Sequence, residues 1–374
     1  MEIHCDQSHE IDDLINKYFN ICSGQLIIKN KNIYYFNKKR KIAFKLKFIK
    51  RLKEFKVIPP NLTSIFVKLY IYINTKKYCK VCLPESTYNP DLIDLGPFFN
   101  TRGVQVKLYN FTKKSVLCYT LNYINIDYFD TELYIYSKYS FLKSIPKLYK
   151  KISAGIYKRE FVDGFTNKKM NVWNTSHIIF NTRYNNHSNQ HLIQFIDAIK
   201  DLMIVYKNEL IDNVLTSIFL ENILDTIKDD LSYDILKKCI DYTNKLDNEL
   251  LIVKAHGDFA LKNIVFSKEV AFIIDWERFS TFSIFYDVGN FIFNCNRTGN
   301  PNIHQLTFQS DYTLNFVSII EQTFGIQIEN KMLCYYVLFM IERLSFEKKL
   351  YSHNISRYRN FLKIWNEHFN TLLN

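Results

Sequence analysis

The strongest constraint on the fold lies within residues 253–290, where short apolar runs rich in β-branched residues alternate with polar residues. The runs Ile264–Phe266 and Val270–Ile274 are separated by three polar residues, and this spacing predicts a β-hairpin. Asn263 directly precedes the first run, and Asp275 directly follows the second. Because a hairpin brings the start of its first strand beside the end of its second, we expect these two side chains at one end of a sheet.

A further apolar run, Leu250–Val253, leads into His256-Gly257-Asp258, and Asp258 lies five residues before Asn263. We expect Asp258 at the same end of the sheet. An amide oxygen, a ligand carboxylate and a second carboxylate as base suit Mg²⁺ and a phosphate chain, because Mg²⁺ prefers hard oxygen ligands and keeps part of its water shell for phosphate oxygens. The alternative is a hairpin whose polar residues only cap turns.

This stretch resembles the catalytic segment of the aminoglycoside phosphotransferase and choline kinase superfamily, which shares the protein-kinase-like fold. The family pattern is H-G-D-x-x-x-x-N, followed by I-D-W/F-E and a later Y-D. The chain fills every position of this pattern: His256, Gly257, Asp258, Asn263, Ile274, Asp275, Trp276, Glu277, Tyr286 and Asp287. The joint match is specific, because each residue type lies at the spacing that its role requires, whereas H-G-D alone would be weak.

The resemblance implies a role for most of the polar residues in this motif. Asp258 would be the catalytic residue that accepts the proton of the substrate hydroxyl. Asn263 and Asp275 would hold Mg²⁺, while His256 and Asp287 would support the catalytic loop. The expected protein is therefore an enzyme, a kinase that transfers the γ-phosphate of ATP or GTP to an alcohol group.

The resemblance also implies an α+β fold of the bilobal, protein-kinase-like kind, with a small β-rich N-lobe and a large helical C-lobe. We expect an N-terminal extension of unknown role over 1–90, a nucleotide-binding N-lobe over 91–163 and a helical catalytic C-lobe over 164–374. Polar loops are expected over 167–190 and 276–290. Apolar residues at helical spacing predict helices over 127–144, 191–209, 211–227, 233–246, 308–324, 331–346 and 356–373.

The expected N-lobe carries two candidate contacts to the nucleotide. Gly103 precedes an expected strand over 104–111 and is the candidate for a phosphate-covering turn, because glycine lets the backbone approach a phosphate closely. The segment with Glu160, Phe161 and Val162 resembles the interlobe hinge of the family, whose backbone hydrogen-bonds the purine.

One position departs from the family pattern. The family has a phosphate-binding lysine near Thr120, on the expected strand over 115–121, and no lysine is present there. Lys107 on the preceding strand, or Lys114, is the candidate replacement. Glu132 lies where the family has the glutamate that pairs with this lysine, and a solvated helix residue is the alternative. The departure keeps open a second hypothesis, a nucleotide-binding pseudokinase module.

Two residues near the motif are candidates for contact with the phosphate acceptor, Glu277 and, in the polar loop 294–302, Arg297. Aminoglycosides and choline are cations, which acidic or aromatic pockets suit. The chain has a net charge of +12, and its helical region shows no dense acidic cluster. These features favour a neutral or anionic acceptor, such as a sugar of a surface polysaccharide or glycolipid. An aminoglycoside- or choline-type phosphotransferase is the alternative.

The expected N-terminal extension contains a predicted hairpin over 25–36 and a basic segment. Between Lys38 and Lys56 there are ten Lys or Arg residues and one acid, Glu54, with aromatic residues interleaved. The segment favours a solvated helix face, and the alternative is an anion-binding surface for lipid or glycolipid headgroups, acidic glycans or nucleic acid.

The sequence carries no sign of secretion or of a membrane span. The start, MEIHCDQSHEIDD, has no basic region followed by an apolar core, and no apolar run approaches the length of a bilayer span. We expect a cytoplasmic protein, with the inner face of the membrane as a peripheral contact and no nucleic-acid partner. The 8 cysteines are scattered, and the one C-x-x-C, Cys79 and Cys82, has no second pair near it, which disfavours zinc.

Overall fold

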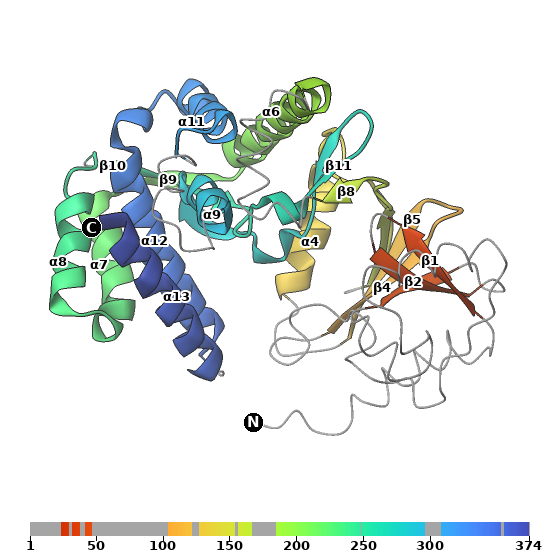
Figure 1. Ribbon diagram of the computed structural model, residues 1–374, viewed down its shortest axis with the longest axis horizontal. Helices are drawn as coiled ribbons and strands as arrows, with labels where there is room; N and C mark the ends of the chain where they lie inside the picture. The colour runs from red at the N-terminus through yellow and green to blue at the C-terminus, as the bar shows by residue number, and fades with distance from the viewer. Residues whose placement is uncertain are drawn as a thin grey trace. The chain divides into compact units, whose positions relative to one another are not determined.

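The computed structural model describes residues 24–29, 32–37, 42–46, 104–121, 127–153, 156–166, 185–247, 249–295, 308–352 and 355–373. They fall into two compact units (Figure 1). The first contains the described residues up to Ser140 together with Pro146–Phe165, and the second contains Phe141–Ile145 with the described residues from Thr166 onward. The first unit is rich in strands and the second in helices, which confirms the α+β division expected from the sequence.

An antiparallel sheet dominates the first unit. Within the described residues it has seven strands in the order β1-β2-β3-β4-β5-β7-β6. The strands are β1 (Gly24–Lys29), β2 (Asn32–Asn37), β3 (Ile42–Leu46), β4 (Val104–Asn110), β5 (Ser115–Leu121), β6 (Leu148–Ser153) and β7 (Ile156–Glu160). The pairing of Ile28 with Ile33 confirms the hairpin expected over 25–36. In the middle of the sheet, Leu108 and Val116 are buried.

The strands of the expected extension and of the expected N-lobe belong to one sheet, because Ala43 of β3 pairs with Tyr109 of β4. The border expected at residue 90 lies outside the described residues, as does most of the basic segment 38–56. The division into three domains therefore stays a prediction.

Helix α4 (Asp127–Lys138) is shorter than the helix expected over 127–144. The reason is the hydrogen bonding of Ser144, whose main-chain N–H donates to Asp201 Oδ2 at 2.8 Å. Its carbonyl accepts from the N–H of Ile273, also at 2.8 Å. Both partners belong to the second unit, and a continued helix would have used these main-chain groups within itself.

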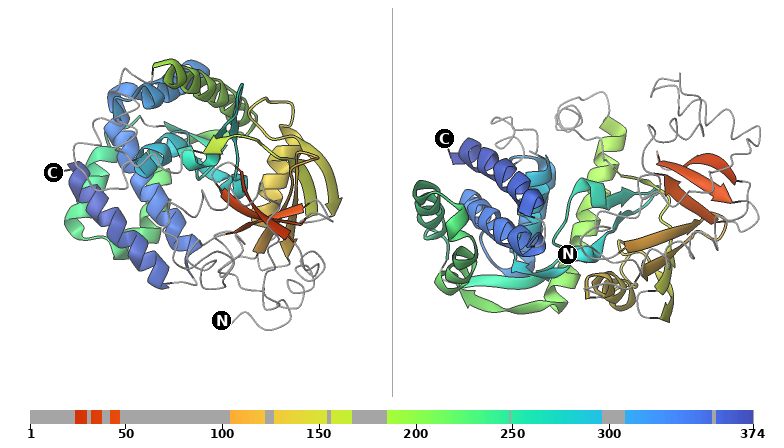
Figure 2. Two further views of the ribbon diagram at one scale, coloured as in Figure 1. Left: turned by 45° about the vertical axis from the view of Figure 1, so that its right-hand side comes forward. Right: turned by 90° about the horizontal axis from the view of Figure 1, so that it is seen from below.

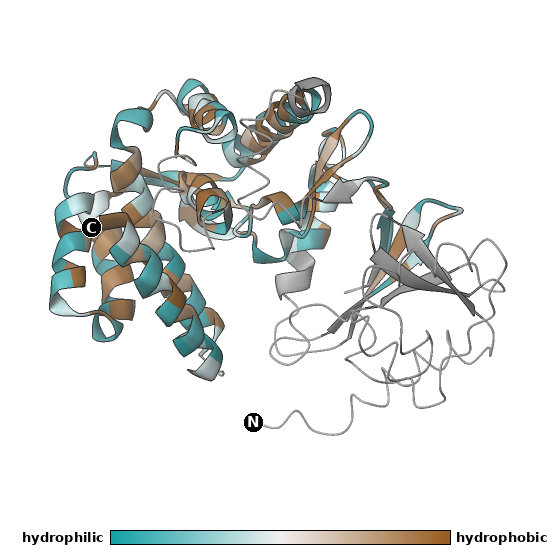
Figure 3. Cartoon of the chain, in the orientation of Figure 1, coloured by the Kyte–Doolittle hydropathy of each residue, from teal (hydrophilic) through white to brown (hydrophobic). Residues whose placement is uncertain are grey.

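The second unit is built around helix α12, in which every side chain from Cys334 to Ser345 is buried. Helices α7, α8, α9 and α13 pack against it, and Figures 1 and 2 show α13 running beside it. The helices are α6 (Asn185–Asn208), α7 (Thr216–Ile227), α8 (Tyr233–Thr243), α9 (Tyr286–Cys295), α11 (Asp311–Phe324), α12 (Met332–Leu350) and α13 (Ile355–Leu373). Hydrophilic and hydrophobic positions alternate along α13 (Figure 3), which buries Trp365 and Phe369. None of the described helices combines the length and apolar character that a bilayer crossing needs.

Two short sheets carry the loops of the second unit. In the described residues, one has the order β13-β10-β9 and the other β12-β11-β8. The strands are β8 (Phe165–Thr166), β9 (Leu210–Leu215), β10 (Glu249–Ala255), β11 (Ile264–Phe266), β12 (Ala271–Ile273) and β13 (Ser280–Ser283). The antiparallel pair β11 and β12 confirms the hairpin expected within 253–290.

Two helix boundaries differ from the expectation. The helix expected over 211–227 was wrong in its first part, because Leu210–Leu215 is strand β9, whose main chain pairs with β10. Helix α6 begins at Asn185, inside the polar loop expected over 167–190. In both places the sequence pattern lacks the tertiary partner that decides between helix, strand and loop.

Helix α9 overturns the loop expected over 276–290. Its first turn carries the polar residue Asp287, which interrupts the apolar pattern although the whole turn is buried. Gly289 faces α12 so closely that a Cβ built on it would lie 2.2 Å from the Phe339 Cγ atom. Glycine at this position therefore lets α9 pack directly on α12.

Candidate active site

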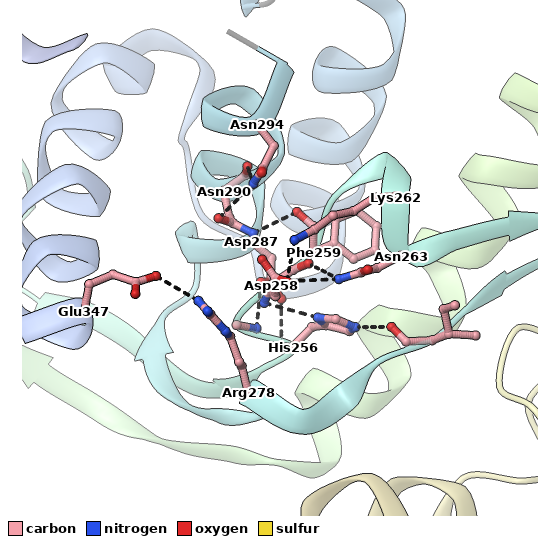
Figure 4. Close-up of polar contacts among 12 residues, drawn as sticks. His256, Asp258, Phe259, Lys262, Asn263, Arg278, Asp287, Asn290, Asn294 and Glu347 are labelled. Carbon is pink, nitrogen blue, oxygen red and sulfur yellow. Dashed lines mark hydrogen bonds and ion pairs between the residues drawn. The ribbon is translucent and has the colours of Figure 1, made fainter. Parts of the chain in front are cut away.

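The residues of the motif lie around the end of strand β10 and the hairpin of β11 and β12 (Figure 4). Strand β10 ends at Ala255, directly before His256. A short 3₁₀ turn, Leu261–Asn263, then leads into β11. The main-chain N–H of Ile274 donates to the carbonyl of Asn263 at 2.9 Å, which continues the hairpin ladder by one pair. Asp275 therefore follows the residue opposite Asn263, and the chain places both at one end of the hairpin.

Asn263 is tied to Asp258 by its side-chain amide. Its Nδ2 donates to the main-chain carbonyl of Asp258 at 2.8 Å and lies 3.2 Å from the carboxylate Oδ2. Because both bonds use the nitrogen, they fix the orientation of the amide and point its oxygen away from Asp258. Asn263 is buried, so this orientation is held by its surroundings.

The carboxylate of Asp258 is ionised. Burial alone would raise its pKa, but the charges of Arg278, Lys262 and Arg343 outweigh burial and hold the pKa well below its usual range. Lys262 Nζ lies 2.8 Å from Asp258 Oδ2. An ionised carboxylate can only accept hydrogen bonds, so Asp258 is suited to orient a hydroxyl group.

His256 connects the loop of Asp258 to the hairpin. Its Nε2 donates to the carbonyl of Ile274 at 2.9 Å, while its Nδ1 accepts the main-chain N–H of Asp258 at 3.2 Å. These two bonds place the proton on Nε2. The ring is buried against Trp276, with ring centroids 4.6 Å apart.

Asp287 holds the same loop from the opposite side. Its carboxylate accepts the main-chain N–H of His256 at 2.7 Å and that of Gly257 at 2.9 Å, and it also accepts the Tyr206 hydroxyl. Gly257 has a φ of 77°, and a Cβ built on it would lie 2.2 Å from the carbonyl oxygen of Arg278. Glycine is therefore required between His256 and Asp258 on steric grounds.

A buried ion network beside Asp258 was not anticipated from the sequence. Arg278 Nη1 lies 2.8 Å from Glu347 Oε1, and Arg343 Nη2 lies 2.6 Å from the same oxygen. Arg343 Nη1 donates to Asn290 Oδ1 at 2.5 Å, and Asn290 Nδ2 donates to the carbonyl of Phe259 at 3.0 Å. The network connects α12, α9 and the loop after Asp258. Arg343 and Glu347 stand four residues apart on one helix, but no local signal connects them to residues 253–290.

The residues expected to bind Mg²⁺ offer a fitting set of donor atoms. Asn263 supplies an amide oxygen that its own hydrogen bonds turn away from Asp258, and Asp275 supplies a carboxylate. Asp275 has a left-handed backbone conformation, with φ 63° and ψ 55°, which is uncommon outside glycine and tends to occur at functional sites. The described residues contain no group of three or more His, Cys, Asp or Glu placed to hold a metal ion. Mg²⁺ commonly takes one or two protein carboxylates and completes its shell with phosphate oxygens and water, so two ligands suffice.

In the first unit, Glu132 is fully buried, so the alternative of a solvated helix residue was wrong. Its carboxylate accepts the hydroxyl of Tyr136 at 2.7 Å and that of Tyr157. The guanidinium of Arg159 lies 5.4 Å from the centre of the Tyr136 ring. Lys107 lies on strand β4, opposite Cys118 of β5. Glu132 thus belongs to a polar cluster inside the first unit.

The expected hinge segment follows strand β7. The main-chain N–H of Glu160 donates to the carbonyl of Lys147 at 2.8 Å, and that of Phe161 donates to Lys114 at 2.9 Å. Val162 carries the next main-chain donor along the segment, and its side chain is buried.

Two expected site residues, Gly103 and Arg297, lie outside the described residues. Glu277 lies in the turn Trp276–Arg278, half-buried, directly after the residue that packs on His256.

Comparison with known proteins gives no match to a family model and no match among curated proteins. Solved structures do show similarity. A putative aminoglycoside phosphotransferase from Ralstonia eutropha is 14% identical, with a TM-score of 0.45 over 72% of this chain and 89% of that chain. A choline kinase from Streptococcus pneumoniae is 15% identical, with a TM-score of 0.41 over 73% and 92%. A glucosamine kinase in complex with glucosamine, ADP and phosphate is 10% identical, with a TM-score of 0.46 over 72% and 78%.

These structures are, by their names, small-molecule phosphotransferases and kinases, the class whose catalytic segment the motif of this chain resembles.

Proposed function

We propose that the protein is an Mg²⁺-dependent kinase that transfers the γ-phosphoryl group of ATP or GTP to a hydroxyl of a small molecule or glycan. One observation carries the proposal. Asn263 is bonded to Asp258 by its amide nitrogen, and Asp275 follows Ile274, the residue opposite Asn263 in the hairpin ladder. An ionised carboxylate and two residues with the kind of oxygen donor that Mg²⁺ prefers thus belong to one end of the hairpin, which supports the proposal.

In this reaction the role of Asp258 is mainly positional. Its carboxylate accepts a hydrogen bond from the acceptor hydroxyl and points an oxygen lone pair of that hydroxyl at the γ-phosphorus. Because its pKa is low, it aligns the nucleophile more than it removes the proton early, which suits a transition state with little demand for a strong base. His256 and Asp287 keep the loop in place through its main chain. Mg²⁺, held by Asn263 and Asp275, would supply neutralisation of the phosphate charge.

The nucleotide base is assigned to the segment Glu160, Phe161 and Val162 of the first unit. The N–H groups of the first two residues are already bonded, so the assignment narrows to the N–H of Val162 and the carbonyls of the segment. The Glu160 carbonyl also accepts from Arg159 at 3.0 Å, which fixes its direction. Lys107, or Lys114, remains the candidate of the first unit for contact with the phosphates, with Glu132 as the carboxylate that would pair with this lysine.

The charge of the whole chain favours a neutral or anionic acceptor, such as a sugar hydroxyl or a sugar bearing an acid group. Its net charge is +12, whereas the cations beside Asp258 are paired with acids: Lys262 with Asp258, and Arg278 and Arg343 with Glu347. A cationic aminoglycoside or choline would meet the positive field of the chain as a whole.

A nucleotide-binding module without transfer activity is the second candidate. It is favoured by strand β5, Ser115–Leu121, which contains no lysine. The two candidates differ in whether labelled phosphate reaches any acceptor.

The test is transfer of label from γ-labelled ATP or GTP, with and without Mg²⁺, to a panel of sugars, choline, aminoglycosides and lipid extracts. Asp258→Asn and Asp275→Asn should each abolish Mg²⁺-dependent transfer, by about 100-fold or more, since each removes a charge that the transition state uses. Asp241→Asn, at an exposed site on α8, is the matched control and should keep wild-type turnover. Wild-type turnover in the Asp275→Asn protein would refute the kinase assignment, and nucleotide binding without transfer to any acceptor would favour the second candidate.

A further inference from the structure

Lys262 is a cation that contacts the carboxylate of Asp258 in the candidate site. It lies in the short turn between Asp258 and Asn263, and its Nζ is 2.8 Å from Asp258 Oδ2. Figure 4 shows the ammonium group and the amide of Asn263 converging on the Asp258 carboxylate. The proposed mechanism does not use Lys262.

The ion pair occupies Oδ2, one of the two oxygens of Asp258 that can accept the acceptor hydroxyl. Oδ2 already receives Lys262 Nζ at 2.8 Å and lies 3.2 Å from Asn263 Nδ2. A hydroxyl that binds at Oδ2 competes with one of these donors. The amide is buried and also bound to the main chain of Asp258, so the ammonium group is the donor that can leave.

Lys262 differs from the other two cations that act on Asp258. The side chain of Arg278 is 12% exposed and that of Arg343 is 8% exposed, and both are bonded to Glu347. The side chain of Lys262 is 42% exposed. A lysine with a free stem can swing its ammonium group over several ångströms, whereas the two guanidinium groups are fixed by a shared buried partner.

We infer that Lys262 binds the phosphoryl group in transfer, exchanging its contact with Asp258 Oδ2 for an oxygen of the γ-phosphate of a bound nucleoside triphosphate. The inference rests on the proposed kinase function. The exchange needs no new charge at the site, because the ammonium group leaves one anionic oxygen for another. It frees Oδ2 for the acceptor hydroxyl at the same moment and places a positive charge where the transition state gathers negative charge.

Lys262 forms no covalent bond in the step. The bond between the acceptor oxygen and the γ-phosphorus forms while the bond from that phosphorus to the β–γ bridging oxygen breaks. The hydroxyl proton passes to Asp258, and the nucleoside diphosphate leaves with the electron pair of the broken bond.

A fixed ion pair is the competing role, and nucleotide binding separates the two. A contact to the γ-phosphate acts on a triphosphate and not on a diphosphate. A fixed pair that only offsets the charge of Asp258 would also shield the γ-phosphate from that charge, so its effect disappears when Lys262→Met is made in an Asp258→Asn background, whereas a direct contact to the γ-phosphate keeps its effect there.

The experiment measures the binding of Mg·ADP and of Mg·AMP-PNP, a triphosphate analogue that resists transfer, by calorimetry. The proteins are the wild type, Lys262→Met, Lys262→Arg, Asp258→Asn with and without Lys262→Met, and the control Lys268→Met, which changes an exposed lysine in the turn of the same hairpin. Lys262→Met should weaken Mg·AMP-PNP roughly 10- to 100-fold, the size of a lost charge-assisted hydrogen bond, and leave Mg·ADP unchanged. Lys262→Arg should recover part of the loss, and Lys268→Met should match the wild type.

Each other result overturns a defined statement. If Lys262→Met binds both nucleotides like the wild type, loses both equally, or has no effect on Mg·AMP-PNP in the Asp258→Asn background, the role of Lys262 is refuted while nucleotide binding stands. If the wild type binds neither nucleotide, the proposed function falls and the role of Lys262 falls with it. Thermal unfolding of each variant shows whether it is folded, and the Mg·ADP titration serves as the internal reference.

Discussion

The contacts of Asp287 predict a large loss in the free energy of unfolding when its carboxylate is removed. This loss can be divided between the donors that the carboxylate accepts. In Asp287→Ala, three buried donors lose their acceptor: the N–H groups of His256 and Gly257 and the hydroxyl of Tyr206. An unpaired buried donor costs about 1–2 kcal/mol after partial hydration, so the three together predict a loss of roughly 3–6 kcal/mol in the free energy of unfolding.

Removing the hydroxyl of Tyr206 separates its contribution to this loss from that of the two main-chain donors. Tyr206→Phe alone should cost only about 1 kcal/mol, since Asp287 keeps its two main-chain donors. In the Tyr206→Phe background, Asp287→Ala leaves two donors unpaired in place of three. The double-mutant cycle should therefore give a coupling free energy of about 1–2 kcal/mol between the two side chains.

Urea denaturation followed by tryptophan fluorescence measures these free energies. Trp276 and Trp365 are fully buried in the second unit, the unit that contains Asp287 and Tyr206. Asp241→Ala, at an exposed site on α8, is the control and should change the free energy by less than about 0.5 kcal/mol. A loss below about 1 kcal/mol in Asp287→Ala, or a coupling near zero, would refute the reasoning that these bonds hold the loop.

Two further predictions concern buried acids of α12 in the same urea assay. Burial raises the pKa of Glu342 to about 8 from 4.5, so between these values the folded state binds a proton that the unfolded state has lost, and stability falls as the pH rises. Glu342→Gln keeps hydrogen bonds to Ser283 but carries no titratable group. It should remove this pH dependence of the free energy of unfolding, which is at most about 1.4 kcal/mol per pH unit. If the pH dependence is undiminished, another group causes it. Glu347→Ala leaves Arg278 and Arg343 without their shared partner and should cost about 3–5 kcal/mol, whereas a near-neutral result would mean that water replaces the carboxylate.

The hairpin of the candidate site could be predicted from the sequence because its signals are local. Ile264–Phe266 is apolar and β-branched in large part, a polar turn follows, and Asn263 and Asp275 stand at the matching ends. Only single hairpins of the seven-stranded sheet could be predicted from the sequence, because the order of the strands depends on partners distant in the chain.

The wrong predictions of secondary structure have a common physical cause. Residues 211–215 were expected as the start of the helix over 211–227, but they belong to strand β9, because their main chain pairs with β10. Helix α9 was expected as part of a polar loop, whereas Asp287 and Asn290 are buried in it and bonded to the loop of Asp258. The secondary structure around a buried polar residue can be predicted only when the hydrogen-bond partners of that residue are known.

The passage of the chain through Phe141–Ile145 has a practical consequence for dividing the protein. These residues belong to the second unit although residues on both sides of them in sequence belong to the first. A fragment that starts at Thr166 would lack Phe141–Ile145. In the intact chain, Ser144 of this segment accepts a hydrogen bond from the N–H of Ile273 at the edge strand β12 and donates its own N–H to Asp201. A separately expressed helical half would thus need this short peptide returned, in trans or by a fused linker, before its hairpin could be compared with that of the intact chain.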